Sequence, residues 1–385
     1  MTRHGYALSN YWPRRWIRCL PEIPDIARYY GVETGRIQQT FSFLFFGAAF
    51  GQIIYGPLAD RFGRKPVIVI TMLIFTVISF VTVYTATPNS HSFARFLQGA
   101  TGAGGLIIVR AIIRDLYDGA LATKMFAYTM VGSSLMPILA PIIGGHVTEL
   151  LGWKPNFFII AGFGLVLTLS LALWLKETGK RDFKALETTE IIKSFTILSK
   201  SKIFIYFTLI TLGPFAGLLC ILAGLSSVLI DFMGISTSIF GYYFAIIMLG
   251  NLLASILAGK LSNSLSSLKL IFIGAIICFL SGMLAYIFAL FGIVDPLSIV
   301  FPAAGFMIGF PLVVLAATAE AMAPLPAIAG KASSLIGLIQ LGCGAIISLI
   351  LGWASDGTQF PLVVALMFSG ILTMIPLRLV YKLNR

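Results

Sequence analysis

Charged side chains are scarce in this sequence: Asp, Glu, Lys and Arg make up 11% of its 385 residues, against about 25% in soluble proteins. So few charges cannot cover a surface in contact with water, and a soluble enzyme is therefore excluded. Cysteine is scarce as well. The four cysteines lie far apart in apolar stretches and indicate neither a disulfide framework nor a metal site; they are Cys19, Cys220, Cys278 and Cys343.

Sequence motifs of several other functions are missing. No nucleotide-binding loop, cluster of metal ligands or nucleophile constellation occurs, so neither ATP-driven transport nor hydrolysis has support. The start of the chain holds no apolar core before a small-residue cleavage site, so no cleavable signal peptide is expected. We expect a protein that is not an enzyme.

Long apolar runs are abundant. Hydrophobic residues make up 58% of the chain, and the mean hydropathy is +0.95. A membrane span needs about 20 apolar residues. In the bilayer its backbone N–H and C=O groups must hydrogen-bond within the protein, which favours a helix. The sequence therefore predicts an all-α polytopic membrane protein. Eleven runs are long enough, at residues 41–59, 67–85, 93–113, 125–147, 156–175, 203–230, 239–261, 268–291, 296–317, 329–353 and 361–380.

A polar stretch divides these runs into two groups. Residues 176–202 carry seven Lys or Arg and four Asp or Glu. They predict a cytoplasmic linker between an N-terminal helical half (1–175) and a C-terminal helical half (203–385). Six runs follow the linker and five precede it, so one span at the front is missing or degraded.

The net charge of +12 comes from unevenly placed cations. Past residue 36, nineteen Lys and Arg lie in loops of one predicted side, and two lie in or beside loops of the other. Loops rich in Lys and Arg stay in the cytoplasm. The excess therefore orients the chain, with its C-terminus cytoplasmic, and nucleic acid is not an expected partner.

The string GPLADRFGRKP at residues 56–66 joins the first two clear spans. Asp60, at a helix end, can bridge to an arginine or to the N-terminus of another helix, in a bond that breaks when a transporter changes state. We interpret the string as a gate latch; the alternative is a basic loop that only sets topology. Its candidate residues are Gly56, Asp60, Arg61, Gly63, Arg64 and Lys65.

This string resembles the cytoplasmic loop motif G-x-L-A-D-[RK]-x-G-R-[RK] of the major facilitator superfamily. An echo, GKLSN at residues 259–263, occupies the corresponding place in the second half. The resemblance implies the major-facilitator fold of two parallel six-helix halves, here with a degenerate or truncated first helix. It also implies a secondary active transporter that works by alternating access.

The fourth helix of that fold carries further candidates. Arg95 in an apolar run is costly unless it faces water or a partner, although it can also snorkel to the membrane surface. The superfamily has a similar R-x-x-Q-G pattern there, which implies a role in proton coupling for Arg95 and Gln98. Arg110 and Arg114 share a helix face. Together with the following Asp115 they are further coupling candidates, as partners for Asp60 across the cytoplasmic gate; the alternative is a basic cap at the membrane surface.

Prolines kink the fifth helix, and the glycines after them permit close packing. Such a helix between the two halves suits alternating access; the alternative is a purely structural helix. The pattern P-x-x-x-P-x-x-G-G resembles the antiporter motif of drug exporters, and here it consists of Pro137, Pro141, Gly144 and Gly145.

A stretch near the C-terminus narrows the resemblance. Residues 326–337 (PAIAGKASSLIG) are similar to the P-x-x-A-G-x-A-S-[AS]-L-x-G signature of the bicyclomycin/chloramphenicol-resistance exporters (Bcr/CflA type). This implies a monomeric multidrug exporter of the inner membrane that exchanges small amphipathic compounds for protons. Its partners are the small-molecule substrate, protons and the lipid bilayer, with no cofactor. Phe215, Phe306 and Phe310 are candidates for the substrate cavity, although lipid-facing packing is the commoner role of phenylalanine.

The front of the chain departs from that subfamily. Ile17 stands where a membrane-embedded Asp is expected, and Arg14, Arg15 and Arg18 flank it. Each arginine would cost about 2.5–3.5 kcal/mol at a bilayer centre. Residues 1–19 are an altered start, a basic lining inside the bundle or an interfacial amphipathic piece, and we favour the first. The nearest substitute acids, Asp231 and Glu320, are both expected at an interface.

Other functions stay open. The motifs do not exclude an exporter of a metabolite or siderophore, or a proton-independent facilitator. Because the first-helix acid is absent, a degraded relative that transports nothing is a further alternative.

Overall fold

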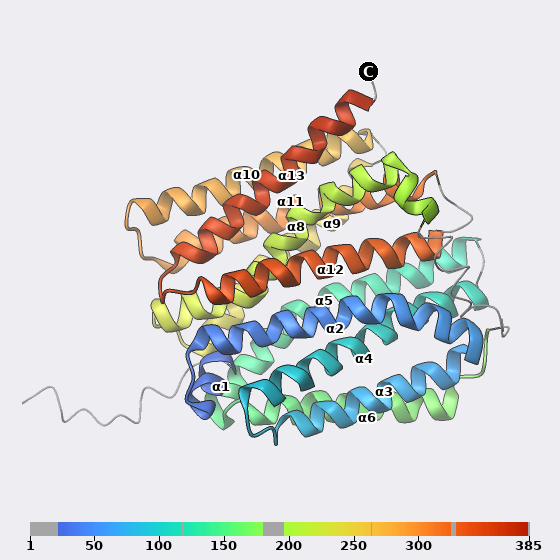
Figure 1. Cartoon of the computed structure of the whole chain (residues 1–385), viewed down its shortest axis with the longest axis horizontal. Coiled ribbons are helices and arrows are strands. Elements are labelled where there is room, and N and C mark those ends of the chain that lie inside the picture. The colour runs from blue at the N-terminus through green and yellow to red at the C-terminus, as the bar shows by residue number, and fades with distance from the viewer. Residues whose placement is uncertain (1–21, 118, 180–195, 263, 325–328, 384–385) are drawn as a thin grey trace, which may run out of the picture.

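Long helices make up most of the described chain. This computed structural model describes residues 22–117, 119–179, 196–262, 264–324 and 329–383. Elongated helices lie roughly side by side across the molecule (Figure 1). Their bounds are α2 (Thr34–Phe62), α3 (Arg64–Thr82), α4 (Pro88–Leu116), α5 (Gly119–Leu151), α6 (Lys154–Trp174), α8 (Lys202–Ser226), α9 (Thr237–Leu261), α10 (Ser267–Leu290), α11 (Pro296–Met322), α12 (Ala329–Trp353) and α13 (Phe360–Leu383).

These helices match the eleven predicted spans. Ten segments within the described ranges are long and apolar enough to cross a membrane, and α5 contributes a shorter apolar part, Leu135–Leu151. The predicted all-α polytopic fold is therefore confirmed. The atypical first span, residues 1–19, lies outside the described residues. The first described element is the short helix α1 (Glu22–Tyr30), which precedes α2.

One element departs from the predicted regular spans. The helix predicted over 203–230 continues past Ser226 as a π-helical turn, η1 (Ser227–Phe232). A π turn changes the direction in which the following side chains point, and such turns recur at functional sites. Here it re-aims the end of α8, including Asp231.

Tight, capped turns connect the helices. Thr87 caps α4 together with Ser90, and Pro88 occupies the first turn of that helix. The Asp295 carboxylate accepts the backbone N–H of Leu297 at 2.8 Å at the start of α11. These caps satisfy backbone groups that a helix start leaves unpaired. Short connections of this kind reverse the chain at each end. We call the end with the α2–α3 turn and residue 177 the linker end, and the opposite end the distal end.

Close backbone contact joins α2 to α4 in the N-terminal group. A Cβ atom built on Gly47 would lie 1.9 Å from the carbonyl oxygen of Phe96, and one on Gly99 would lie 1.8 Å from that of Leu44. Only glycine permits this approach. In the second group, α8 packs against α11, α12 and α13.

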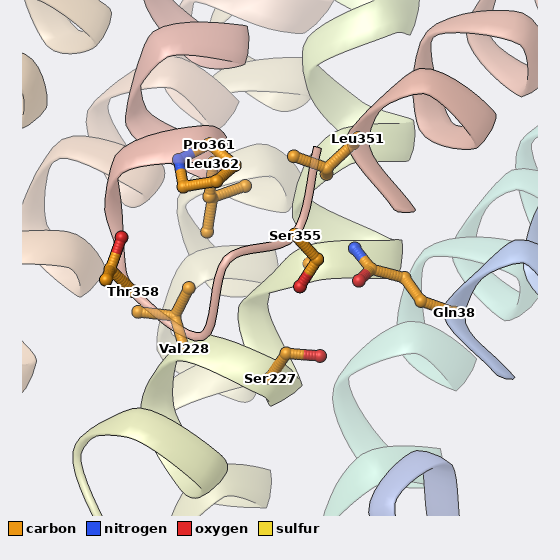
Figure 2. Close-up of a pocket in the computed structure, with 9 residues that line it drawn as sticks. Gln38, Ser227, Val228, Leu351, Ser355, Thr358, Pro361 and Leu362 are labelled. Carbon is orange, nitrogen blue, oxygen red and sulfur yellow. The ribbon is translucent and has the colours of Figure 1, made fainter. Parts of the chain in front are cut away.

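The two groups of helices meet mainly along two pairs, α2 with α12 and α5 with α9. In Figure 1, α2–α6 occupy the lower part of the view and α8–α13 the upper part. At the distal end the contact is intimate: a Cβ on Gly35 of α2 would lie 2.6 Å from the carbonyl oxygen of Gly352 in α12. A small pocket lies on this seam, between Gln38 of α2 and Ser227 of η1 (Figure 2).

Candidate functional site

The turn between α2 and α3 is built around Gly63. Its φ of +101° lies in the region that favours glycine. Its N–H donates to the carbonyl of Ala59 at 3.1 Å, and α3 starts at the next residue, Arg64. A Cβ on Gly63 would also lie 2.4 Å from a carboxylate oxygen of Glu177. Glycine therefore allows both the abrupt turn and the approach of Glu177.

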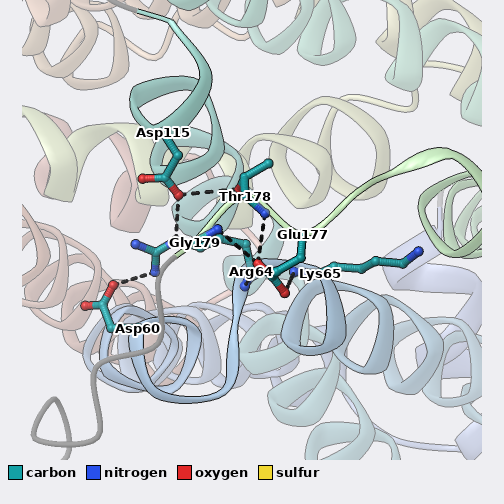
Figure 3. A network of polar contacts seen from close by, with 7 residues as sticks. All are labelled: Asp60, Arg64, Lys65, Asp115, Glu177, Thr178 and Gly179. Atoms are coloured by element: carbon teal, nitrogen blue, oxygen red, sulfur yellow. Dashed lines mark hydrogen bonds and ion pairs between the residues drawn. The ribbon is translucent and has the colours of Figure 1, made fainter.

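Arg64 joins two acids in this region (Figure 3). Its Nη1 donates to Asp60 Oδ1 at 2.5 Å, and its Nε donates to Asp115 Oδ2 at 3.1 Å. The Arg64 side chain is 12% exposed, whereas that of Asp60 is 46% exposed. A guanidinium with several fixed donors suits such a double contact. Arg64 thus ties the end of α2 to the end of α4.

Glu177 caps the start of α3. Its carboxylate accepts the backbone N–H groups of Arg64 at 2.8 Å and Lys65 at 3.3 Å, and also those of Thr178 and Gly179 at 3.0 Å each. Burial raises the pKa of this carboxyl, but the four N–H donors outweigh it and hold the pKa below its usual value. A carboxylate at a helix N-terminus is also favoured by the helix dipole.

The other predicted residues of this loop lie around the network. The guanidinium of Arg61 lies 5.7 Å from the ring centroid of Phe62. Gly56 faces open space, because a Cβ there would meet no atom within 4 Å. Arg110 is exposed on α4, and the side chain of Arg114 lies outside the described set. Hence Arg64, rather than Arg110, bridges Asp60 to α4 in this conformation.

Arg95 lies inside the N-terminal group near the distal end. The residue is 6% exposed, and its guanidinium lies 4.5 Å from the ring centroid of Phe157 and 5.5 Å from that of Phe41. Its Nη1 donates to Gln98 Oε1 at 3.1 Å, and the Gln98 amide donates to Ser79 at 2.8 Å. The side chain therefore does not snorkel to the surface; it packs between aromatic rings of α2 and α6.

The Pro–Gly pattern of α5 lies where α5 meets α9. A Cβ on Gly145 would lie 2.6 Å from the carbonyl oxygen of Thr237, and one on Gly241 would lie 2.6 Å from that of Pro141. The Gly144 carbonyl accepts a hydrogen bond from Asn156 of α6 at 3.3 Å. Pro137, one helical turn before Pro141, is exposed. Gly145 and Pro141 thus shape the close approach of these two helices.

The three candidate cavity phenylalanines lie between α8 and α11. Phe215 and Phe310 form an edge-to-face pair with ring centroids 5.2 Å apart, and both are partly buried. Phe306 is fully buried, directly beneath Gly217. In this conformation Phe306 packs inside the C-terminal group.

The sequence did not predict the contacts that three polar residues make near the linker and distal ends. Glu177 is one of four acids in the predicted linker, and no local pattern distinguishes it. His146 of α5 lies 3.3 Å from the Tyr242 hydroxyl of α9. Asp231 of η1 lies beside Thr34 of α2. Each contact joins segments far apart in sequence, so only folding reveals it.

The described residues contain no group of three or more His, Cys, Asp or Glu that could hold a metal ion. What the linker-end network can do is mechanical and electrostatic: it fixes the α2–α3 turn through ion pairs and a helix cap. Such contacts can form in one conformation and break in another.

Several curated proteins have similar sequences. The chain is 29% identical over 346 residues to the bicyclomycin resistance protein homolog of Haemophilus influenzae, covering 89% of this chain and 86% of that protein. It is 30% identical over 332 residues to multidrug resistance protein D of Escherichia coli, covering 86% and 83%. It is 27% identical to the multidrug resistance protein MdtL of Shewanella oneidensis, covering 90% and 87%.

Solved structures share the fold. A mutant of the peptide transporter POT, in complex with sulfate, superposes with a TM-score of 0.73 at 16% identity, covering 94% of this chain and 91% of that one. The partially occluded inward-open xylose transporter XylE of E. coli superposes with a TM-score of 0.69 at 13% identity, covering 90% and 88%.

The family model of the Major Facilitator Superfamily matches residues 19–349, which is most of the chain. Together with the helical architecture and the α2–α3 loop, this match identifies a transporter rather than an enzyme. The protein is a multi-pass membrane protein that belongs to the Major Facilitator Superfamily.

Proposed function

We propose that this protein exports small amphipathic compounds by proton antiport and alternating access. The observation that carries the proposal is similarity over more than four fifths of the chain to proteins named for multidrug and bicyclomycin resistance. The proposal places the chain as a monomer in the inner membrane, with the linker end and C-terminus cytoplasmic. That orientation rests on the nineteen basic residues that the sequence assigns to loops of one predicted side.

In this proposal residues 1–175 and 203–385 move against each other, joined by the linker 176–202. The moving contacts are those of α2 with α12 and of α5 with α9. Asp60 is the latch of the linker end. Its exposed carboxylate, held by Arg64 in this conformation, exchanges partners when the two halves approach there. Arg95, Gln98, Arg110, Arg114 and Asp115 are the proposed coupling residues, and Phe215, Phe306 and Phe310 the proposed cavity residues.

A proton-independent facilitator is a second candidate, favoured by one observation. Ile17 occupies the position where the resembled exporters carry an acid, so the usual group for proton exchange is absent. The same observation also fits a transporter whose coupling of export to proton movement is altered. Export of a metabolite or siderophore differs from drug export only in the substrate.

One experiment separates these functions. Cells that express the chain are loaded with chloramphenicol or ethidium, and the retained amount is measured with and without an uncoupler. Antiport predicts reduced retention that the uncoupler abolishes, whereas a facilitator gives equilibration that the uncoupler leaves unchanged. Unaltered retention of both probes, with folded protein in the membrane, would count against drug export.

A further inference from the structure

A polar contact crosses the seam between the two groups of helices at the distal end. Asp231 of η1 lies beside Thr34, the first residue of α2, and within electrostatic range of Asp25 and Arg28 of α1. Asp25 and Arg28 are themselves an ion pair. The contact therefore joins the C-terminal group to the start of the N-terminal group.

A second pair of polar side chains lies one helical turn deeper. Gln38 and Ser227 line one small pocket, with Ser355 from the α12–α13 connection beside them (Figure 2). Gln38 is 2% exposed. Among the described residues, neither its Oε1 atom nor the Ser227 hydroxyl has a hydrogen-bond partner. Both point into the pocket, where they can hold a water molecule between them.

The helix geometry aligns the two pairs of side chains. Thr34 and Gln38 are four residues apart on α2 and share a face. Ser227 and Asp231 are four residues apart in the π turn, whose wider winding keeps them near one face. Thr34 thus faces Asp231 at the surface, and Gln38 faces Ser227 beneath it.

Close packing surrounds the inner pair. Gly224 lies one turn below Ser227, and a Cβ there would lie 3.3 Å from the Gln38 amide nitrogen. On the other side, Gly35 and Gly352 meet backbone to backbone. A hydrogen bond that can be exchanged for one to water makes only a small net contribution to stability. Polar groups on such a seam can therefore separate and be hydrated at low cost, which a purely apolar seam cannot do.

We propose that these two pairs of side chains, Asp231 with Thr34 and Ser227 with Gln38, form the distal gate of the transporter, and that the inner pair binds water between its members. The gate closes the path to the distal side in this conformation and separates in the opposite one. The proposal rests on alternating access, part of the proposed function, but assigns the gate to residues outside every motif of the sequence.

Cross-linking tests the gate directly. Cysteines replace Thr34 and Asp231 in a chain whose four native cysteines are changed to serine, and an oxidant joins them. We expect efflux of the probe to fall at least tenfold on oxidation and to recover on reduction. The control pair replaces Tyr30 and Thr85, which touch within the N-terminal group at the same end, and its cross-link should leave efflux unchanged. Undiminished efflux with the Thr34–Asp231 cross-link formed overturns the proposal.

A second measurement needs neither substrate nor transport. Gln38→Cys is labelled with a membrane-impermeant thiol reagent from the distal side. Asp231→Ala removes the outer contact and should raise the labelling rate several-fold, whereas Asp231→Asn keeps a side-chain oxygen and should change it little. Equal rates in all three backgrounds contradict the gate. If the rates differ as expected while no probe is exported, the gate stands and the proposed function fails.

Hydrogen exchange tests the role of Asp231 in a chain that keeps its native cysteines. Backbone amides of residues 34–38 should exchange faster in Asp231→Ala than in Asp231→Asn. Identical protection in both variants contradicts a role of Asp231 in holding the seam.

Discussion

The carboxylate of Glu177 accepts the backbone N–H of Arg64 at 2.8 Å, although 113 residues separate the two in the chain. The start of the linker thereby caps the helix that follows the α2–α3 turn. This contact connects the linker between the two halves with the loop that carries Asp60. A change in the linker can therefore reach the loop through one carboxylate.

Replacing Glu177 tests this cap. Glu177→Ala removes the acceptor of four backbone N–H groups, and loss of such a cap costs about 0.5–2 kcal/mol. We expect a lower melting temperature of the detergent-solubilised protein and faster hydrogen exchange at residues 64–66. Glu177→Gln keeps a side-chain oxygen and should lose less. Equal melting temperatures for Glu177→Ala and the unchanged protein would refute the cap.

Acid should weaken the same contact. The pKa of the Glu177 carboxyl is lowered in the folded protein by its N–H donors, against the opposing effect of burial. Its contribution to stability is therefore complete above the ordinary glutamate pKa of about 4.3 and is lost as the pH falls through the lower folded-state value. Between pH 6 and pH 3, the unchanged protein should lose more stability than Glu177→Gln. Parallel melting curves for the two proteins over this range would contradict the lowered pKa.

Asp60→Asn tests the proposed latch. The substitution keeps the size of the side chain but removes its charge from Arg64, which lies 2.5 Å away. We expect efflux of the probe to fall about tenfold, equivalent to ~1.4 kcal/mol, with the protein still present in the membrane. Lys176→Gln, a charge change in the nearby linker, is the control and should have little effect. Unchanged efflux in Asp60→Asn argues against the latch.

We predict that Arg95 stabilises the protein through the planar shape of its guanidinium as well as through its charge. Arg95→Lys keeps the charge but loses the guanidinium that lies 4.5 Å from the Phe157 ring. Cation–π contacts contribute about 0.5–2 kcal/mol, more for buried pairs. We expect lower thermal stability for Arg95→Lys and for Phe157→Leu, with a double variant less destabilised than the sum. Strict additivity would show that the two side chains do not interact.

The packing of α2 on α4 can be tested with two glycines of one helix. Gly99→Ala places a methyl group 1.8 Å from the Leu44 carbonyl oxygen, so the helices must separate. Overpacking of this kind costs about 1–3 kcal/mol or more. Gly102→Ala places its methyl at an ordinary 3.5 Å from Phe75 and is the matched control. Gly99→Ala should lower the melting temperature clearly more than Gly102→Ala; similar values would disprove the close contact.

The spans and the α2–α3 loop could be predicted because their signals are local. A run of apolar residues specifies a membrane helix by itself, and the pattern around Asp60 and Gly63 lies within eleven consecutive residues. The π turn η1 escaped prediction because it interrupts an apolar run without a change in composition. The packing of Arg95 between Phe41 and Phe157 escaped as well, because it depends on how α2, α4 and α6 lie together.

The sequence alone determined that this protein is a polytopic helical transporter of a recognisable family, because hydropathy, basic loops and short motifs are properties of neighbouring residues. The tertiary structure decided which charges meet. It placed Glu177 on the start of α3 and Asp231 beside Thr34. The physical reason is that a polar side chain at a helix end takes its partner from whichever helix end packs beside it. That choice depends on the arrangement of the whole bundle.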